Sequence, residues 1–260
     1  LNSPRIAGLP PLWRDAVVPY DFEKNITFSH KAVHRAMSTL ERVSCLRFKR
    51  VQRPDEDDDN NDSETSPMPF LMVTATDGCA NADLGAWSPS YLRLSPWCAR
   101  SSRVVLHELM HIIGFQHEHQ RADRDDYIRI RMDNIDPANY NNFQKYANVH
   151  DLSLPYDFGS VLHYDPWHRS AGNGTTYDCV NETRCFTGNS QLSEIDVERI
   201  NRIYCTEPKF GLCHNQRFND ATHACCSVKG RAEMPAVNEE LSTTRNAFIC
   251  DIWMNTILFS

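Results

Sequence analysis

The sequence predicts an α+β protein, with one domain of two lobes and a small cysteine-rich extension at its C-terminus. Short segments that alternate between apolar and polar residues lie within the first hundred residues, and a strongly apolar helical segment follows at 101–114. The residues from 115 to 190 are rich in Asn, Asp, Gly and Pro, which favours irregular structure. We therefore expect a twisted mixed sheet with two helices in the first lobe and a largely irregular second lobe.

The first lobe can be divided by local patterns. Residues 1–20 are rich in proline and are expected to be extended. A helix is expected after Ser29, a suitable N-cap, because Val33, Met37, Leu40 and Val43 form an apolar stripe at helical spacing. Strands are expected at 45–51, 70–76 and 90–98. The acidic run at 54–67 lacks the spaced ligands and the glycine of an EF-hand calcium loop, so we expect a solvated surface loop there.

Two further helices and a boundary complete the predicted organisation. The segment 101–114 is apolar on most of its surface, which predicts a buried helix that ends at Gly114. The last helix is expected at 192–205, where Ser193 and Asp196 have the spacing of a capping box. We expect a domain over 1–205, with lobes of about 13–114 and 115–205, and a disulfide-stapled extension over 206–260.

Composition indicates an extracellular protein. The 260 residues carry a formal net charge of −7, which argues against nucleic acid and anionic membranes as partners. No apolar run approaches the ~20 residues that a membrane span needs. The ten cysteines include no CxxC pair, so five disulfides are favoured over a metal cluster. We expect a secreted monomer without its signal peptide, with N-glycosylation candidates at Asn25, Asn61, Asn173 and Asn181.

The segment HELMHIIGFQHEHQRADRD, at 107–125, carries the chemistry. His107 and His111 are four residues apart, so both rings lie on one face of a helix and can bind one zinc ion. Glu108 stands where the H-E-x-x-H pattern places a general base. Gly114 can take a left-handed conformation, and the resulting turn would bring His117 back to the metal as the third ligand. We expect a structural contact rather than a fourth bond from His119.

This segment fits HExxHxxGFxHExxRxDRD at every fixed position, and it resembles the zinc-binding signature of the astacins, a family of the metzincin clan. The resemblance extends from Leu12 and Trp13 to NRIYC, which ends at Cys205, and covers roughly three quarters of the chain. It implies a zinc metalloendopeptidase with one catalytic zinc, whose protein or peptide substrates lie extended along an edge strand near Cys79 to Ala82. Water activated by the metal would hydrolyse the peptide bond, with Glu108 as general base.

The resemblance also assigns residues outside this segment. SVLHYD, at 160–165, resembles the S-x-M-H-Y turn that lies beneath the metal, with Leu162 where the family has methionine. Because leucine is apolar and close in volume to methionine, such a swap costs less than about 1.5 kcal/mol. Tyr164 matches the tyrosine that stabilises the transition state. Glu118 matches the glutamate that contacts the mature amino terminus once the propeptide of the zymogen is removed.

Disulfide pairs are implied by the same resemblance. Cys45 would pair with Cys205 and Cys79 with Cys98, and we expect the additional Cys179 and Cys185 to close a small loop. Adjacent Cys225 and Cys226 would be strained as a pair. Two connectivities with Cys213 and Cys250 therefore stay open.

A different class of function stays open beside the peptidase. The chain could be a catalytically weak or inactive extracellular binding protein that keeps zinc as a structural ion, and Leu162 is the one feature in favour of this alternative. Glu108 speaks against it, since a structural site has no use for a base. A structural zinc also prefers four protein ligands, whereas the sequence offers three.

Overall fold

The computed structural model describes residues 10–24, 26–51, 68–146, 152–172, 174–181, 190–205, 216–219 and 224–227. By its internal contacts the chain divides into two units, Leu1–Tyr204 and Cys205–Ser260. The described elements of the second unit are the strands β8 (Gln216–Asn219) and β9 (Ala224–Ser227), which pair antiparallel. Within the described residues, no helix is long and apolar enough to cross a membrane.

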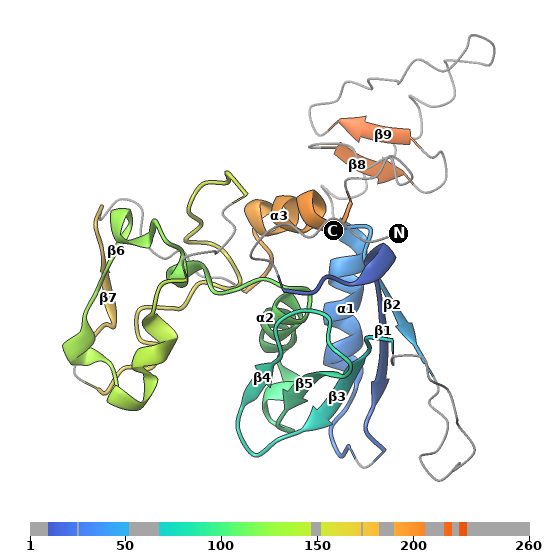
Figure 1. Cartoon of the computed structure of the whole chain (residues 1–260), viewed down its shortest axis with the longest axis horizontal. Coiled ribbons are helices and arrows are strands. Elements are labelled where there is room, and N and C mark those ends of the chain that lie inside the picture. Colours follow the sequence, from blue (N-terminus) through green and yellow to red (C-terminus); the bar gives the residue numbers. More distant parts are fainter. Residues whose placement is uncertain are drawn as a thin grey trace, which may run out of the picture. The chain divides into compact units, whose positions relative to one another are not determined.

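A five-stranded mixed sheet organises the first lobe (Figure 1). Its strand order is β2-β1-β3-β5-β4, in which only β4 runs antiparallel, along the β5 edge. The strands are β1 (Val17–Phe22), β2 (Arg47–Arg50), β3 (Leu71–Ala75), β4 (Ala80–Ala82) and β5 (Ser90–Leu94). The edge strand β4 therefore coincides with the segment where an extended substrate was expected.

Strand β1 begins within the proline-rich segment 1–20 that the sequence predicts to be extended. It pairs in parallel with β2 on one side and β3 on the other, so it is an inner strand of the sheet. Its side chains alternate in burial, with Val18, Tyr20 and Phe22 facing the core. The end of the segment expected to be extended is thus held in the sheet by strand pairing and burial.

Two helices of the first lobe pack together on one face of this sheet (Figure 1). Helix α1 (Lys31–Val43) has His30 as its N-cap, one residue later than the predicted Ser29. Ser29 Oγ accepts a long hydrogen bond from the Lys31 backbone N–H at 3.4 Å. Helix α2 (Ser102–Ile112) begins after Ser101, whose side chain accepts from Val104 N–H. Their apolar stripes bury against the sheet, which fixes the position of α2 and of the side chains that it presents on its opposite side.

The second lobe contains more structure than the sequence predicts. Strands β6 (Ile128–Ile130) and β7 (Tyr177–Cys179) pair antiparallel, and helix α3 (Glu194–Tyr204) closes the lobe. Short 3-10 helices carry much of its remaining chain: η3 (Glu118–Gln120), η4 (Arg124–Asp126), η5 (Met132–Asn134) and η6 (Pro137–Phe143). Two others, η1 (Arg14–Ala16) and η2 (Cys98–Arg100), lie in the first lobe. A small apolar cluster of Ile135, Phe143 and Tyr164 stabilises the second lobe beside the histidine segment.

One disulfide is fully described. Cys79, which immediately precedes β4, is bonded to Cys98, with their Cα atoms 5.4 Å apart. Cys45, Cys179 and Cys205 are also disulfide-bonded. The expected pairs Cys45–Cys205 and Cys179–Cys185 stay predictions, and Cys185 lies outside the described residues.

Several other sequence predictions fall partly or wholly outside the described part of the chain. They concern the acidic run at 54–67, the cysteines of the extension, and the glycosylation candidates Asn25, Asn61 and Asn173. The fourth candidate, Asn181, is described and its side chain is exposed, as a glycan would require.

Candidate metal centre

Helix α2 carries the first two histidines and the glutamate between them. Its apolar residues Val105, Leu106, Leu109, Met110 and Ile112 are buried, so the helix cannot rotate without exposing them. The rings of His107 and His111 consequently lie on the same side, with centroids 4.9 Å apart. The four-residue spacing therefore places both rings on one face of α2, as the sequence predicts.

Gly114 ends α2 with a sharp change of direction. Its φ is +98°, in the left-handed region, and the N–H groups of Gly114 and Phe115 donate to the carbonyls of His111 and Met110 at 2.8 and 3.0 Å. These two bonds form a Schellman motif, which satisfies the last carbonyls of the helix. A Cβ at Gly114 would lie 3.2 Å from Pro10 Cγ, so glycine is favoured by the surrounding space as well as by φ.

The turn brings His117 back to the other two histidines. Its Nε2 atom lies 3.2 Å from Nε2 of His107 and 3.2 Å from Nε2 of His111. Zinc bound by three imidazoles at 2.0–2.1 Å in tetrahedral geometry sets the ligand atoms about 3.3–3.4 Å apart. The three nitrogens are therefore spaced to hold one zinc ion, and this is the one such group of His, Cys, Asp or Glu among the described residues.

Hydrogen bonds fix the tautomer of each ring. Nδ1 of His107 lies 2.7 Å from the Val161 carbonyl, and Nδ1 of His111 lies 2.6 Å from the Phe115 carbonyl. Because a carbonyl oxygen only accepts, both Nδ1 atoms carry the proton, and each Nε2 directs a lone pair inward. Nδ1 of His117 pairs with Oε1 of Gln120 at 3.0 Å in the same way.

The pKa values of the three histidines agree with neutral rings of these tautomers. Burial lowers the pKa of His107 to about 3 and that of His111 to about 4, and it also lowers the pKa of His117 well below its usual value. All three rings are therefore neutral near pH 7, as zinc ligands must be. Three convergent lone pairs repel one another unless a cation lies between them, so the donor set fits zinc.

Glu108 is mostly shielded from solvent, with 8% of its surface exposed. Burial raises the pKa of its carboxyl group to about 7, and the positive charge of Arg169 acts in the opposite direction. A carboxyl group of this kind can accept and release a proton near neutral pH, which is the property of a general base.

Tyr164 lies against the third ligand. Its ring centroid is 4.6 Å from that of His117, and its other contacts include a stacked ring of His119 at 4.0 Å. Burial raises the pKa of the Tyr164 hydroxyl, whereas the charge of Arg169 and a side-chain hydrogen bond from it lower that pKa. His119 itself is fully buried, with Nε2 paired to the Asn142 carbonyl at 2.9 Å, so it makes a structural contact.

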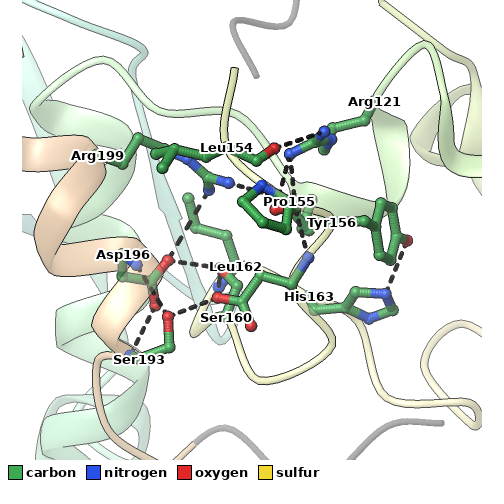
Figure 2. A network of polar contacts seen from close by, with 12 residues as sticks. Arg121, Leu154, Pro155, Tyr156, Ser160, Leu162, His163, Ser193, Asp196 and Arg199 are labelled. Carbon is green, nitrogen blue, oxygen red and sulfur yellow. Dashed lines mark hydrogen bonds and ion pairs between the residues drawn. The ribbon is translucent and has the colours of Figure 1, made fainter. Parts of the chain in front are cut away.

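The turn at 160–163 lies beneath the histidines, and Leu162 is completely buried in it. The Leu162 N–H donates to Ser160 Oγ at 3.1 Å, and its carbonyl accepts from the Glu118 backbone N–H at 3.3 Å. Figure 2 shows the polar network around this turn. The leucine side chain therefore fills apolar space, while the backbone of the turn makes the polar contacts.

Glu118 forms a buried ionic cluster. Oε1 accepts from Arg121 Nη1 at 3.2 Å and from the Asp157 backbone N–H at 2.9 Å, and Oε2 lies 2.9 Å from Arg199 Nη2. The side chains of Glu118, Arg121 and Arg199 are each less than 5% exposed. The expected contact between Glu118 and a mature amino terminus stays a prediction, because residues 1–9 lie outside the described part.

The sequence did not indicate every residue of the site. Gln120 orients His117 from three positions further along, in η3. In the sequence, only its spacing of three residues from His117 could have indicated this contact. The acceptors for His107 and His111 are main-chain carbonyls, which leave no trace in side-chain identity.

The sequence model of the astacin family of peptidases matches residues 7–205. The chain belongs to the astacin family. Among curated relatives, this astacin is 32% identical over 255 residues to the astacin-like metalloendopeptidase of Gallus gallus, covering 90% of the chain and 59% of the relative. It is 32% identical over 199 residues to the zinc metalloproteinase nas-14 of Caenorhabditis elegans, covering 74% of the chain and 37% of the relative. The chain therefore spans less than two thirds of either relative.

Solved structures support the same fold for this astacin. High choriolytic enzyme 1 of Oryzias latipes, a hatching enzyme zinc-protease, superposes with a TM-score of 0.66 at 26% identity, covering 80% of this chain and 99% of that one. Myroilysin superposes with a TM-score of 0.53 at 18% identity, covering 75% of this chain and 96% of that one, which supports the fold alone. The match to the astacin family covers residues 7–205, and the three-histidine zinc site lies within them.

Proposed function

We propose that this astacin is a secreted zinc endopeptidase that hydrolyses peptide bonds of extracellular proteins. The convergence of three neutral imidazoles beside the buried carboxyl group of Glu108 carries the proposal. Zinc held by the three Nε2 atoms would supply a Lewis acid that acidifies a water molecule and polarises the scissile carbonyl. The single described disulfide and the further bonded cysteines support an oxidising, extracellular compartment.

Glu108 holds and moves the proton in this mechanism. Its carboxylate accepts a proton from the attacking water and delivers it to the amine that leaves. Burial raises the pKa of Glu108 to about 7, so the proton taken up in the first step can be released in the second. A structural zinc site has no use for a buried carboxyl group that exchanges a proton near neutral pH.

Tyr164 contributes to charge stabilisation. Its ring packs against the rings of His119 and Phe143, so the hydroxyl has a restricted range of positions. We assign it the role of donating a hydrogen bond to the oxyanion that develops on the scissile carbonyl. Arg169, which hydrogen bonds to Tyr164, brings a positive charge to the same region and makes the hydroxyl a better donor.

The edge strand β4 gives the substrate a place to bind. It is paired with β5 on one side, so an extended peptide can add to the sheet on the other side. The disulfide from Cys79 to Cys98 ties down the start of this strand. A rigid edge lowers the entropy cost of binding an extended chain.

The test is cleavage of casein or gelatin by the full chain, with and without a zinc chelator. We expect activity that the chelator abolishes and added zinc restores. Glu108→Gln keeps the shape of the side chain but removes the base, so it should lose activity while it still binds zinc. Glu194→Gln, an exposed position in α3, is the matched control and should retain activity. A zinc-loaded wild type without peptidase activity, or an active Glu108→Gln, would favour the non-catalytic binding protein.

A further inference from the structure

Asp196 in α3 does more than cap its own helix. As the capping-box spacing predicts, its backbone N–H donates to Ser193 Oγ at 2.8 Å and its Oδ2 accepts from Ser193 N–H at 3.1 Å. The carboxylate also reaches the turn beneath the zinc site (Figure 2). Oδ2 accepts from Val161 N–H at 2.9 Å, and Oδ1 accepts from the Ser160 hydroxyl at 2.7 Å.

The Ser160 hydroxyl connects the Asp196 carboxylate to a peptide group by a second hydrogen bond. Because it donates its proton to Asp196, its oxygen is available as an acceptor, and the Leu162 N–H donates to it at 3.1 Å. That N–H belongs to the peptide group between Val161 and Leu162. The carbonyl of the same peptide group accepts from Nδ1–H of His107 at 2.7 Å.

Four groups are therefore connected in series: a carboxylate, a hydroxyl, a peptide group and an imidazole. In each hydrogen bond the proton points toward the carboxylate end. Aligned hydrogen bonds polarise one another, so the peptide carbonyl becomes a stronger acceptor for the His107 proton. Asp196 and Ser160 are each 0% exposed, so water does not screen this effect.

We propose that Asp196 is a positioning residue for the zinc ligand His107 and acts through Ser160 and the Val161–Leu162 peptide group. Histidine ligands commonly donate their second N–H to a carboxylate or carbonyl, which fixes the ring and raises its basicity. Here the carboxylate lies two hydrogen-bonded groups beyond the carbonyl. The proposal concerns zinc affinity and rests on the zinc site, so it does not require peptidase activity.

Zinc affinity of the full chain, measured against a competing chelator, tests the proposal. Ser160→Ala removes the hydroxyl that connects Asp196 to the peptide group. We expect its zinc Kd to rise by about tenfold, the lower end of the effect of removing a direct partner of a ligand. Ser193→Ala is the matched control, because it removes the helix cap and a hydrogen bond to Asp157 but leaves the series intact. It should lower the thermal unfolding temperature without changing the zinc Kd.

A second measurement reports on the ring itself. In ¹⁵N-labelled, metal-free wild type, His107 should be the tautomer with a proton on Nδ1. The resonance of that proton should move upfield in Ser160→Ala and stay in place in Ser193→Ala. If the alanine variant does not fold, Ser160→Cys keeps the buried position filled while it weakens both hydrogen bonds, and the same outcomes apply.

Three results would overturn the proposal. They are an unchanged zinc Kd in the variants of Ser160, an equal loss of affinity in Ser193→Ala, and a wild-type His107 that carries its proton on Nε2. A chain that binds zinc as expected but cleaves no peptide would contradict the proposed function alone. The two conclusions can therefore fail separately.

Discussion

Nε2 of His111 lies 3.2 Å from Nε2 of His117, although the end of α2 separates the two residues. In a continuous helix, six residues would rotate the second side chain by about 240°, away from the first. The left-handed φ of +98° at Gly114 reverses the chain and removes this obstacle. The third ligand therefore depends on a residue that never touches the metal.

The first prediction concerns that glycine. Gly114→Ala places a side chain at a left-handed φ and brings its Cβ to 3.2 Å from Pro10 Cγ. We expect unfolding of the metal-free protein to become easier by about 1–2 kcal/mol in urea titrations, and zinc affinity to fall. Gly78→Ala is the control, since its Cβ would meet nothing closer than Thr76 Oγ1 at 4.0 Å. Equal zinc affinity in Gly114→Ala and wild type would contradict the role of the turn.

Metal removal gives the second prediction. In the metal-free site the Nε2 lone pair of His117 lies 3.2 Å from Nε2 of His107 and from Nε2 of His111, and zinc both removes this repulsion and ties α2 to the turn that follows it. A ligand at 100 times its Kd stabilises the folded state by about 2.7 kcal/mol. We therefore expect the unfolding temperature to rise steadily with free zinc and to fall on chelation. An unfolding temperature that does not respond to zinc would argue against a preformed site.

The zinc site was largely predictable because its information is local. The four-residue spacing of His107 and His111, the position of Glu108 and the glycine before His117 all lie within one short segment. The buried helix and the position of its end followed from the same stretch. Local patterns suffice where the chemistry is built on one helix and one turn.

The partners of these residues were not predictable, for physical reasons. Glu118 pairs with Arg199, which is 81 positions further along and reaches it only through the fold. His107 is oriented by a main-chain carbonyl, and any residue at position 161 would supply that atom. Residues 1–20 were expected only to be extended, and the pairing of β1 with β2 and β3 was not predictable because those strands lie far along the chain.

The third prediction tests Tyr164. Tyr164→Phe retains the ring and its packing against His119 but removes the hydroxyl. Since we place that hydroxyl near the developing oxyanion, kcat should fall by about 100-fold while KM changes little. Tyr140→Phe, at a more exposed position in η6, should leave both constants unchanged. A large rise in KM at constant kcat would show that the hydroxyl binds substrate instead.

The fourth prediction concerns the turn that carries leucine in place of methionine. Leu162 is 0% exposed, and only its main chain makes polar contacts with Ser160 and Glu118. Leu162→Met should therefore change stability by less than about 1.5 kcal/mol and leave the zinc Kd nearly unchanged. Leu162→Ala should cost about 2–5 kcal/mol, because it leaves a cavity under the site. A gain of zinc affinity in the methionine variant would show that leucine weakens the site.

The fifth prediction is a pH dependence. Asp123 forms a two-pronged ion pair with Arg121, with Nη2–Oδ2 at 2.8 Å and Nε–Oδ1 at 2.9 Å, and this hydrogen bonding lowers the pKa of Asp123. A carboxyl group whose pKa is lower in the folded than in the unfolded state stabilises the fold above its unfolded pKa of about 3.9. That stabilisation is lost as the pH falls through the lower, folded value.

Asp123→Asn should thus be less stable than wild type at pH 7, by an amount on the order of 1 kcal/mol after screening at a partly exposed site. The difference should shrink in urea titrations below about pH 4, whereas Asp126→Asn, at an exposed position, should match wild type at every pH. A stability difference between Asp123→Asn and wild type that is constant with pH would mean that packing, and not the ion pair, is what the substitution removes.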